Sequence, residues 1–419
     1  LLAAVRCGAD AVYFGLRGFN ARRNAENFNG SDLRQTIVYC HERGVRVYIT
    51  VNTLVLDAEF GEMEKTVDEA CSSGADGLIV QDLAVFSYAK RAWPEVPLFA
   101  STQMAVHNAE GVRLLEDMGF SRFVLARELT LSEIADIREK TSAQLEVFVH
   151  GAMCMAVSGR CLISSYLTGR SGNEGHCTQP CRWNYDLAVS DTEEAFFAVT
   201  EEKRPGVFFP VEQDAHGSYI LNAKDLCMLA HLDELRASGV ASVKIEGRNK
   251  KALYVATVVN AYRHVLDGEP ADAWTPELDC VSHRPYSTGF FFGRADQAHD
   301  YEGYQQECLH VADVVACEAV SDGWQCTLRC HNRFFAGEEL EVLAPGQPVG
   351  RLTAANPCWL ARNDDGSLAD PVPVEVANRA TDLYRIDSPA PIPQGALLRR
   401  REFRRTSRVT PCSDVENGV

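Results

Sequence analysis

The sequence contains no run of about 18 apolar residues, the length that a membrane-spanning helix needs. Its first residues, LLAAVRCGAD, carry neither a basic segment nor a small-residue cleavage site, so no secretory signal is visible. These absences favour a cytoplasmic protein without a membrane span. The chain opens in what reads as the middle of an amphipathic helix, and we therefore expect a truncated N-terminus.

Positive charge is scarce, because 41 Lys and Arg face 58 Asp and Glu, which gives a net charge of -17. This balance argues against a protein whose whole surface follows a polyanion, but it leaves room for a local basic site. Disorder is also a poor description, since hydrophobic residues make up 46% and charged residues 24% of the 419. A chain of this length can form two or three domains with a large core.

Cysteine is abundant, with 15 residues in the chain. Without an export signal these residues do not indicate a disulfide framework, because thiols stay reduced in the cytosol. We therefore expect reduced thiols, some of which bind metal.

Short β-rich apolar runs alternate with longer segments of helical period as far as about residue 250, a pattern typical of βαβ units. Seven strands are predicted, at 11–15, 46–52, 76–82, 97–103, 122–128, 146–151 and 242–248. An eighth is expected just before the first helix. Eight such units predict an α/β fold with a (β/α)8 TIM-like barrel, and an open doubly wound sheet is the alternative.

The domain organisation follows from changes in this pattern. The prediction is a barrel domain at 1–265 with an insertion at 152–241, a turn-rich linker at 266–306, a small all-β barrel at 307–405 and a tail at 406–419.

Several predicted strands end in polar residues, and in a barrel these ends share the rim where catalytic groups converge. A solvated strand end explains any one of them equally well, but not so many together. The residues are Asn52, Gln81, Asp82, Gln103, Arg127, Glu128, His150, Glu246 and Arg248.

Four cysteines in the insertion, Cys154, Cys161, Cys177 and Cys181, form a C-x6-C-x15-C-x3-C array in a glycine-rich segment. Zinc sites usually contain short C-x2-C pairs, which this array lacks, whereas iron–sulfur clusters accept wider spacings. The spacing therefore favours a [4Fe-4S] cluster over structural zinc, with unrelated free thiols as the remaining alternative. Cys227, in the same insertion, could replace one of the four ligands.

One long run, VFVHGAMCMAVSGRCLISSYLTGRSGNEGHCTQPCRW, carries a resemblance together with GADAVYFG, FNARR, NAKDL and SVKIEGR. These motifs resemble the collagenase-like peptidase family, peptidase family U32, over residues 1 to about 265. HNRFF and GEELEVLAP resemble the C-terminal domain of the same family. The likeness is therefore nearly complete along the chain.

The resemblance implies one of two activities. The family is named for proteolysis of collagen, yet several members resemble oxygen-independent hydroxylases that use a [4Fe-4S] cluster and prephenate as oxygen donor. The layout here is most similar to the branch that hydroxylates the tRNA wobble uridine, and ribosomal RNA or a quinone precursor are other compatible substrates. The implied cluster ligands are the four cysteines of the array, and Cys227 stays open because another branch takes a ligand further downstream.

A peptidase is the alternative function, and a non-catalytic or assembly role is a third. Neither HExxH nor GxSxG occurs, so a metallopeptidase or a serine hydrolase of those types is not indicated. A cysteine peptidase would pair a thiolate with a histidine, for which His150 with Cys154 and His176 with Cys177 are candidates. Four cysteines, where one would suffice, argue against this interpretation.

An anionic co-substrate such as prephenate would need cationic side chains, and Arg binds carboxylates in a bidentate manner. Each arginine could instead form a structural ion pair. Glu246 could orient an arginine or transfer a proton, and Arg248 and His150 complete the expected catalytic set. The expected substrate-binding residues are Arg22, Arg23, Arg127, Gln103 and Lys244.

The basic stretch RRREFRRTSR near the C-terminus could contact RNA phosphates, with a solvated terminal strand as the alternative. Trp183 and Tyr185 could stack on a flipped base or belong to the core. The chain could also form homo- or hetero-oligomers. The expected RNA-binding residues are Arg399, Arg400, Arg404 and Arg405.

Overall fold

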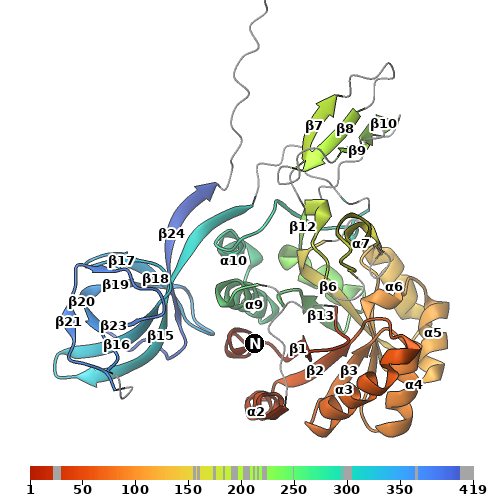
Figure 1. The fold of residues 1–419 in the computed structure, drawn as a ribbon, viewed down its shortest axis with the longest axis horizontal. Helices are drawn as coiled ribbons and strands as arrows, with labels where there is room; N and C mark the ends of the chain where they lie inside the picture. Colours follow the sequence, from red (N-terminus) through yellow and green to blue (C-terminus); the bar gives the residue numbers. More distant parts are fainter. Residues whose placement is uncertain are drawn as a thin grey trace, which may run out of the picture.

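A computed structural model shows how the chain folds (Figure 1). It describes residues 1–21, 30–153, 157, 161–172, 176–182, 185–189, 197–201, 208–210, 213–214, 217–218, 224–248, 250–293, 295, 304–363 and 367–405. Within these ranges no helix is long and apolar enough to cross a membrane.

A parallel sheet with helices on its outer side forms the N-terminal unit (Figure 1). All seven predicted strands are present, and each pairs in parallel with the next. They are β1 (Ala11–Gly15), β2 (Arg46–Val51), β3 (Gly77–Val80), β4 (Leu98–Ala100), β5 (Arg122–Val124), β6 (Gln144–Ala152) and β13 (Ser242–Ile245). Helices of this unit are α1 (Leu2–Arg6), α2 (Gly30–His41), α3 (Phe60–Ser72), α4 (Leu83–Ala92), α5 (Ala109–Met118), α6 (Leu131–Lys140) and α9 (Ala252–Leu266).

Local chemistry explains where the helices begin. The Asp82 side chain accepts a hydrogen bond from the backbone of α4, and Asn108 does the same for α5. Thr130 and Glu133 form a reciprocal capping box at α6. Each cap satisfies backbone N–H groups that the helix itself leaves unbonded.

The two outer parallel strands face one cavity of about 1590 Å³, which residues of β1 and β13 line together. Among the described residues β1 pairs only with β2, and β13 only with β6. These seven strands are therefore parallel and helix-covered, as expected, although β12 later joins the same sheet antiparallel to β6. Closure into an eight-stranded barrel stays a prediction.

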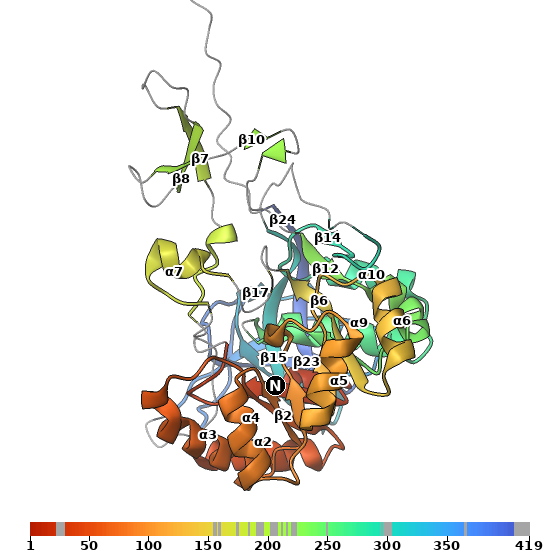
Figure 2. The same ribbon diagram turned by 90° about the vertical axis from the view of Figure 1, so that its right-hand side faces the viewer.

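Two segments depart from the predicted domain boundaries (Figure 2). The insertion ends before residue 241, because β12 (Asp225–Cys227) joins the main sheet between β6 and β14 (Tyr286–Ser287), and α8 (Leu232–Ala237) follows. The expected linker contains a helix, α10 (Ala271–Leu278), whose Trp274 and Leu278 are buried. Gly, Pro and Asp indicated turns here, but a proline before the first turn is compatible with a helix.

The rest of the insertion contains α7 (Ile163–Thr168) and small antiparallel strands. These are β7 (Tyr185–Val189), β8 (Phe197–Glu201), β9 (Phe208–Pro210), β10 (Gln213–Asp214) and β11 (Gly217–Ser218).

From 304 to 405 the described residues form strands and no helix, as the alternating pattern predicted. Eight strands form one sheet in the order β19-β18-β24-β15-β16-β23-β20-β21, and pairing between its two outer strands is not seen in these residues. A closed β-barrel therefore stays a prediction. The strands are β15 (Gln305–Val320), β16 (Gly323–Cys330), β17 (Phe334–Phe335), β18 (Glu339–Leu343), β19 (Gly350–Thr353), β20 (Ala355–Leu360), β21 (Val372–Pro373), β22 (Val376–Ala377), β23 (Leu383–Ser388) and β24 (Leu397–Arg405).

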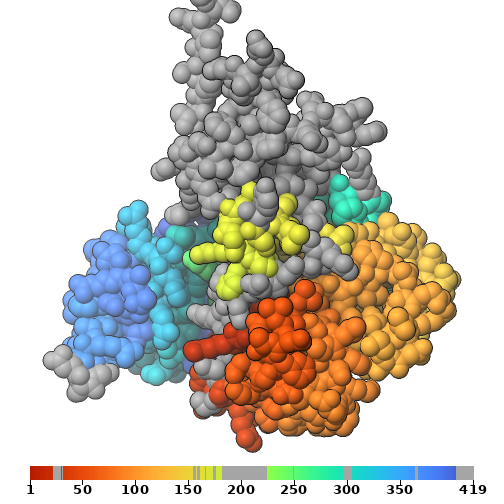
Figure 3. Space-filling view, turned by 45° about the vertical axis from the view of Figure 1, so that its right-hand side comes forward, coloured from red at the N-terminus to blue at the C-terminus, as the bar shows by residue number. Residues whose placement is uncertain are grey.

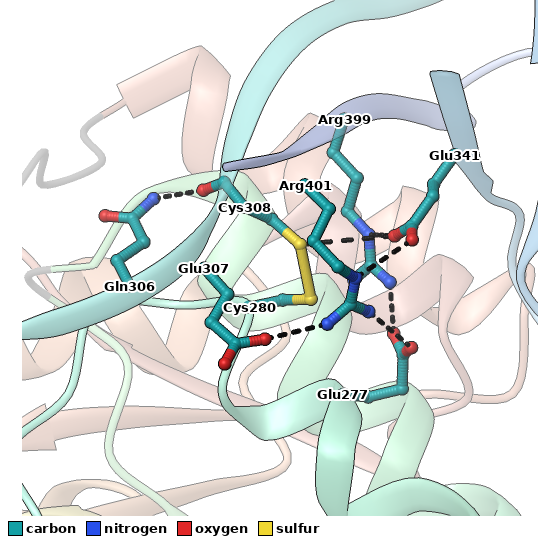
Figure 4. Close-up of polar contacts among 8 residues, drawn as sticks. All are labelled: Glu277, Cys280, Gln306, Glu307, Cys308, Glu341, Arg399 and Arg401. Carbon is teal, nitrogen blue, oxygen red and sulfur yellow. Dashed lines mark hydrogen bonds and ion pairs between the residues drawn. A yellow bond between two sulfur atoms is a disulfide. The ribbon is translucent and has the colours of Figure 1, made fainter. Parts of the chain in front are cut away.

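Four cysteines are joined in disulfides, contrary to the expectation of reduced thiols. Cys317 and Cys326 lie directly opposite each other in the β15–β16 hairpin, so the strand register brings them together. The other disulfide joins Cys280, just after α10, to Cys308 on β15 (Figure 4). Their sequence spacing gives no sign of either pair, because pairing depends on the tertiary fold.

Candidate functional site

Side chains from three parallel strands converge at their carboxyl ends. The Tyr13 hydroxyl on β1 donates to a Glu246 carboxylate oxygen at 3.4 Å and to the Ile245 carbonyl at 3.2 Å. Arg248, just after β13, donates to the Thr50 hydroxyl on β2 at 2.9 Å, and its guanidinium lies 5.3 Å from the centre of the Tyr13 ring. The predicted pair Glu246 and Arg248 is thus brought together, with Tyr13 and Arg248 on the wall of the cavity.

Gly151 makes room for this cluster at the end of β6. Its φ of +111° lies in the region that favours glycine. A Cβ at this position would lie 2.8 Å from the Glu246 carbonyl oxygen and 3.1 Å from the Glu246 Cβ. The backbone N–H of Glu246 also bonds to the His150 carbonyl at 3.0 Å. Any other residue here would displace the carboxylate.

A second polar cluster joins the ends of β2 and β4. The Asn52 side-chain amide donates to Gln103 Oε1 at 2.6 Å and to the Ser101 hydroxyl at 3.3 Å. The Asn52 oxygen accepts the backbone N–H of Ala21 at 3.2 Å, which ties the start of the FNARR motif to the rim. Gln103 is therefore at the rim, as predicted, whereas Arg22 and Arg23 lie outside the described residues.

Lys244 forms part of a buried ion network rather than a vacant substrate site. Its ammonium lies 2.8 Å from Glu146, which Arg122 approaches to 3.4 Å from the other side. Burial would raise the pKa of Glu146, but Lys244 and Arg122 outweigh it and hold that pKa below its usual range. Glu146 balances the charge of Lys244, which also lines the cavity, so its role toward a substrate carboxylate stays a prediction.

His150 is placed differently from the prediction. It is 1% exposed and packs among the rings of Tyr254, Tyr262 and Tyr286, with centroids 5.3–6.0 Å away. Burial lowers the pKa of His150 to about 3, so the ring is neutral near pH 7. The side chain does not line the cavity, and its prediction as a catalytic group or as a peptidase histidine is therefore wrong.

Arg127 lies where β6 leads into the cysteine segment. Its guanidinium donates to the Ala152 carbonyl at 3.1 Å and stacks over the Phe148 ring at 4.1 Å. These contacts hold the end of β6, two residues before Cys154. Arg127 therefore positions the entry to the cysteine array.

The two segments that contain the other array cysteines pack against each other. Ser164 on α7 donates to the Arg170 carbonyl at 2.7 Å and accepts the backbone N–H of Thr178 at 3.0 Å. A Cβ on Gly172 would lie 3.9 Å from Cys177 Sγ and 4.0 Å from the Cys161 carbonyl. The segment around α7 lies on the surface beside the N-terminal unit (yellow in Figure 3).

This arrangement fits a thiolate-ligated cluster. Cys161 and Cys181 are half-buried and Cys177 is exposed, in segments that hydrogen bonds hold together. Cys154 lies outside the described residues, so the set of four is not seen complete. Thiolates are the usual ligands of iron–sulfur clusters.

Cys227 belongs to the main sheet. It lies on β12, opposite His150 on β6, and packs at the edge of the main core. Burial raises the pKa of the Cys227 thiol. The choice between Cys181 and Cys227 as the fourth ligand stays a prediction, since both thiols are half-buried.

The basic stretch does not present a row of vacant arginines (Figure 4). Arg399 is 0% exposed and forms ion pairs with Glu277 and Glu341. Its prediction as an RNA contact is wrong, because a buried, paired guanidinium cannot reach a phosphate. Arg400 is also mostly buried and pairs with Glu338 and Glu402.

At the C-terminal end of β24, RNA binding by Arg404 and Arg405 stays a prediction. Arg404 and Arg405 lie on β24 opposite Gln306 and Gln305, and their side chains are outside the description, as is Trp183. Tyr185 lies on β7, and its side chain is likewise not described.

Sequence analysis missed Tyr13, Thr50 and Glu146. Tyr13 and Thr50 lie inside predicted strands, and Glu146 is the first residue of one, whereas most predicted site residues lie at the carboxyl ends of strands. A polar residue at alternate positions of an otherwise apolar strand was the available signal.

Comparison with known proteins places these features in context. A family model described as Peptidase family U32 matches residues 1–301. The chain is 33% identical over 375 residues to tRNA hydroxylation protein P of Escherichia coli (strain K12), covering 81% of this chain and 82% of that protein. It is 38% identical over 264 residues to a 23S rRNA 5-hydroxycytidine synthase of the same strain, covering 63% and 37%.

It is also 33% identical over 318 residues to a collagenase of Porphyromonas gingivalis, covering 70% of this chain and 71% of that protein. A solved U32 peptidase structure matches 35% of this chain at 18% identity with a TM-score of 0.29. The family match extends over most of the chain and includes the strands and cysteines of the candidate site. The chain belongs to peptidase family U32.

Proposed function

We propose that the protein is an oxygen-independent RNA hydroxylase that acts on the wobble uridine of tRNA. The observation that carries the proposal is the similarity to tRNA hydroxylation protein P over four-fifths of both chains. The match covers 81% of this chain, more than the 301 residues that the family model matches. The rRNA-modifying relative supports RNA as the class of substrate.

Cys154, Cys161, Cys177 and Cys181 would hold a [4Fe-4S] cluster, and the hydrogen bonds of Ser164 support this by keeping two of the cysteine segments together. Such a cluster, when bound, supplies electron-transfer chemistry beside the rim of the sheet.

Prephenate, the proposed oxygen donor, is a dicarboxylate and needs a cation at the cavity. Arg248 lines this cavity, and its contacts with Thr50 and the Tyr13 ring orient the guanidinium. Glu246 accepts hydrogen bonds from the Arg248 backbone at 3.2 Å and from Tyr13, so it positions the loop and can receive a proton from the tyrosine. Arg127, which follows β5, donates to the Ala152 carbonyl and does not line this cavity.

Mass spectrometry of nucleosides tests the function directly. In a deletion strain, tRNA should lose one modified uridine, and plasmid-borne parent protein should restore it. Cys177→Ala and Arg248→Met should fail to restore it, whereas Arg113→Met, in an exposed ion pair with Glu110, should restore it fully. Unchanged tRNA together with a missing rRNA modification would replace tRNA by rRNA as substrate, and no change in either RNA would refute the proposal.

A peptidase is the second candidate, because of the collagenase relative. The burial of His150 among three tyrosines argues against the pair His150 with Cys154, because the low pKa makes this ring a weak base. The pair His176 with Cys177 stays a candidate. Collagen cleavage that Cys154→Ala abolishes, in protein without iron, would favour the peptidase.

A further inference from the structure

A cluster of metal-binding side chains lies in the C-terminal unit, far along the chain from the cysteine array. His310 and Asp313 are on β15, and His331 follows β16 directly. One ligand atom from each residue lies within 4.8 Å of the others. Two imidazoles and one carboxylate are a common ligand set for zinc and similar divalent ions.

The carboxylate of Asp313 lies between the two rings. His310 Nε2 is 2.9 Å from one Asp313 oxygen, and His331 Nε2 is 2.8 Å from the other. The two ring centroids are 4.4 Å apart. In a tetrahedral zinc site with bonds of about 2.0–2.1 Å, neighbouring ligand atoms are about 3.3 Å apart. Widening each contact by about half an ångström would therefore admit the ion.

The backbone around the cluster is held in place. The β15–β16 hairpin pairs Ala312 with Cys330, one residue before His331. The backbone N–H of His331 bonds to the Val311 carbonyl at 2.8 Å, and the Asn332 amide donates to the His310 carbonyl at 2.7 Å. Ligands on a rigid hairpin lose little freedom when they bind a metal.

The three side chains also line the cavity between the two units. His310 is largely buried, whereas His331 and Asp313 are about one-third exposed. An ion held by these three ligands would keep a coordination position toward the cavity, which is the arrangement of zinc sites that bind water or a ligand.

We propose that His310, Asp313 and His331 form a binding site for a divalent transition metal of the zinc class, with three protein ligands and an open position that faces the cavity. The site is independent of the cysteine array and of the proposed hydroxylase activity.

Zinc uptake of the full chain tests the proposal. Purified protein is dialysed against micromolar zinc, and zinc and iron per chain are measured. The parent should bind one zinc more than Asp313→Asn or His331→Ala, with the same iron content. Loss of one ligand should weaken zinc binding at least 100-fold, since even outer-shell partners cost 10–100-fold.

A matched control is His231→Ala. His231 contacts Glu234 at 3.0 Å with the same spacing of three residues and similar exposure, but it has no second histidine in the described part of the chain. This variant should bind as much zinc as the parent. If the parent binds no extra zinc, or Asp313→Asn binds as much as the parent, the three residues form only a hydrogen-bonded cluster and the proposal is wrong.

X-ray absorption at the zinc edge separates this site from the cysteines. Ligation by nitrogen and oxygen gives distances of about 2.0–2.2 Å, and thiolate ligation gives about 2.3 Å. A shell of the first kind that disappears in His310→Gln supports the proposal. A sulfur shell in every variant would overturn it, because the extra zinc would then lie at the cysteine array.

Discussion

Burial decides the chemistry of His150. Tyrosines enclose the ring, and burial lowers the pKa of His150 to about 3, against about 6.5 in an unfolded chain. Between these values the unfolded chain binds a proton that the folded chain does not. The stabilisation from neutral His150 is therefore complete above about pH 6.5 and is lost as the pH falls toward 3.

His150→Gln should reduce the acid sensitivity of the fold. From pH 7 to pH 5 the parent should lose about 2 kcal/mol of unfolding free energy through this residue, at about 1.4 kcal/mol per pH unit below 6.5. Urea unfolding at both pH values measures the loss, and the variant should lose about 2 kcal/mol less. Equal losses would mean that His150 accepts a proton in the folded protein.

Arg399 should stabilise the fold rather than bind RNA. Arg399→Met leaves Glu277 and Glu341 without their buried partner and should lower the unfolding free energy by about 3–5 kcal/mol. Arg401→Met, which removes a 41% exposed arginine with the same two partners, should cost about 1 kcal/mol or less. Urea unfolding measures both losses.

Binding of tRNA to the same variants separates the two roles of the basic stretch. Arg399→Met, tested well below its unfolding transition, should bind tRNA like the parent. If Arg399→Met instead binds tRNA more weakly and with a smaller salt dependence, at unchanged stability, then Arg399 does contact RNA despite its buried position.

Among the elements, α7 and the segment after it should depend on one hydroxyl. Ser164 is buried and bonds to both Arg170 and Thr178, so Ser164→Ala removes the link between the two cysteine segments. We expect iron to leave this variant at least several-fold faster on exposure to chelator, because its ligands are less well positioned. The measurement is the decay of iron per chain.

Ser165→Ala is the matched control for this element, because Ser165 is the next residue of the same helix. Its iron should leave at the parent rate. If both variants lose iron equally fast, the effect belongs to the helix and not to the hydroxyl of Ser164.

The success of the prediction also differed between elements. The seven parallel strands were predicted because each is a run of buried β-branched and apolar residues bounded by turns. β12 and β14 have only three and two residues, too few to show any period. They are strands because β12 pairs with the end of β6 and β14 pairs with β12. Because β12 is too short to be recognised, the predicted insertion extended to residue 241, beyond the start of this strand.

At the scale of the whole molecule, the core of the N-terminal unit includes residues of the C-terminal unit, which also has a core of its own. Leu343 and Leu397, from β18 and β24, belong to the same buried cluster as the residues of α9. The Gly346 N–H also donates to the Asn260 side chain on α9 at 3.2 Å. We therefore expect both units to unfold in a single transition.

Replacing both leucines should separate that transition into two. Leu343→Ala with Leu397→Ala removes about 2–5 kcal/mol per residue from the shared core. Calorimetry should then show two peaks, whereas Val311→Ala, within the C-terminal core alone, should lower the stability without separating the peaks. One peak in the double variant would mean that polar contacts such as the Arg399 ion pairs are enough to couple the units.

The sequence alone determined the order of the parallel strands, the all-strand pattern of the C-terminal residues, the cysteine array and the family resemblance. These features depend on local periodicity and on motifs, which can be identified without knowing the fold. Only the tertiary structure decided which charges are neutralised and which are available. Lys244 pairs with Glu146, 98 residues away in the sequence, and Arg399 pairs with Glu277, 122 residues away. Both cations are therefore buried in ion pairs, and Arg399 is not available to bind RNA. A side chain's period predicts the face it occupies, but its partner comes from whichever distant strand or helix packs against that face.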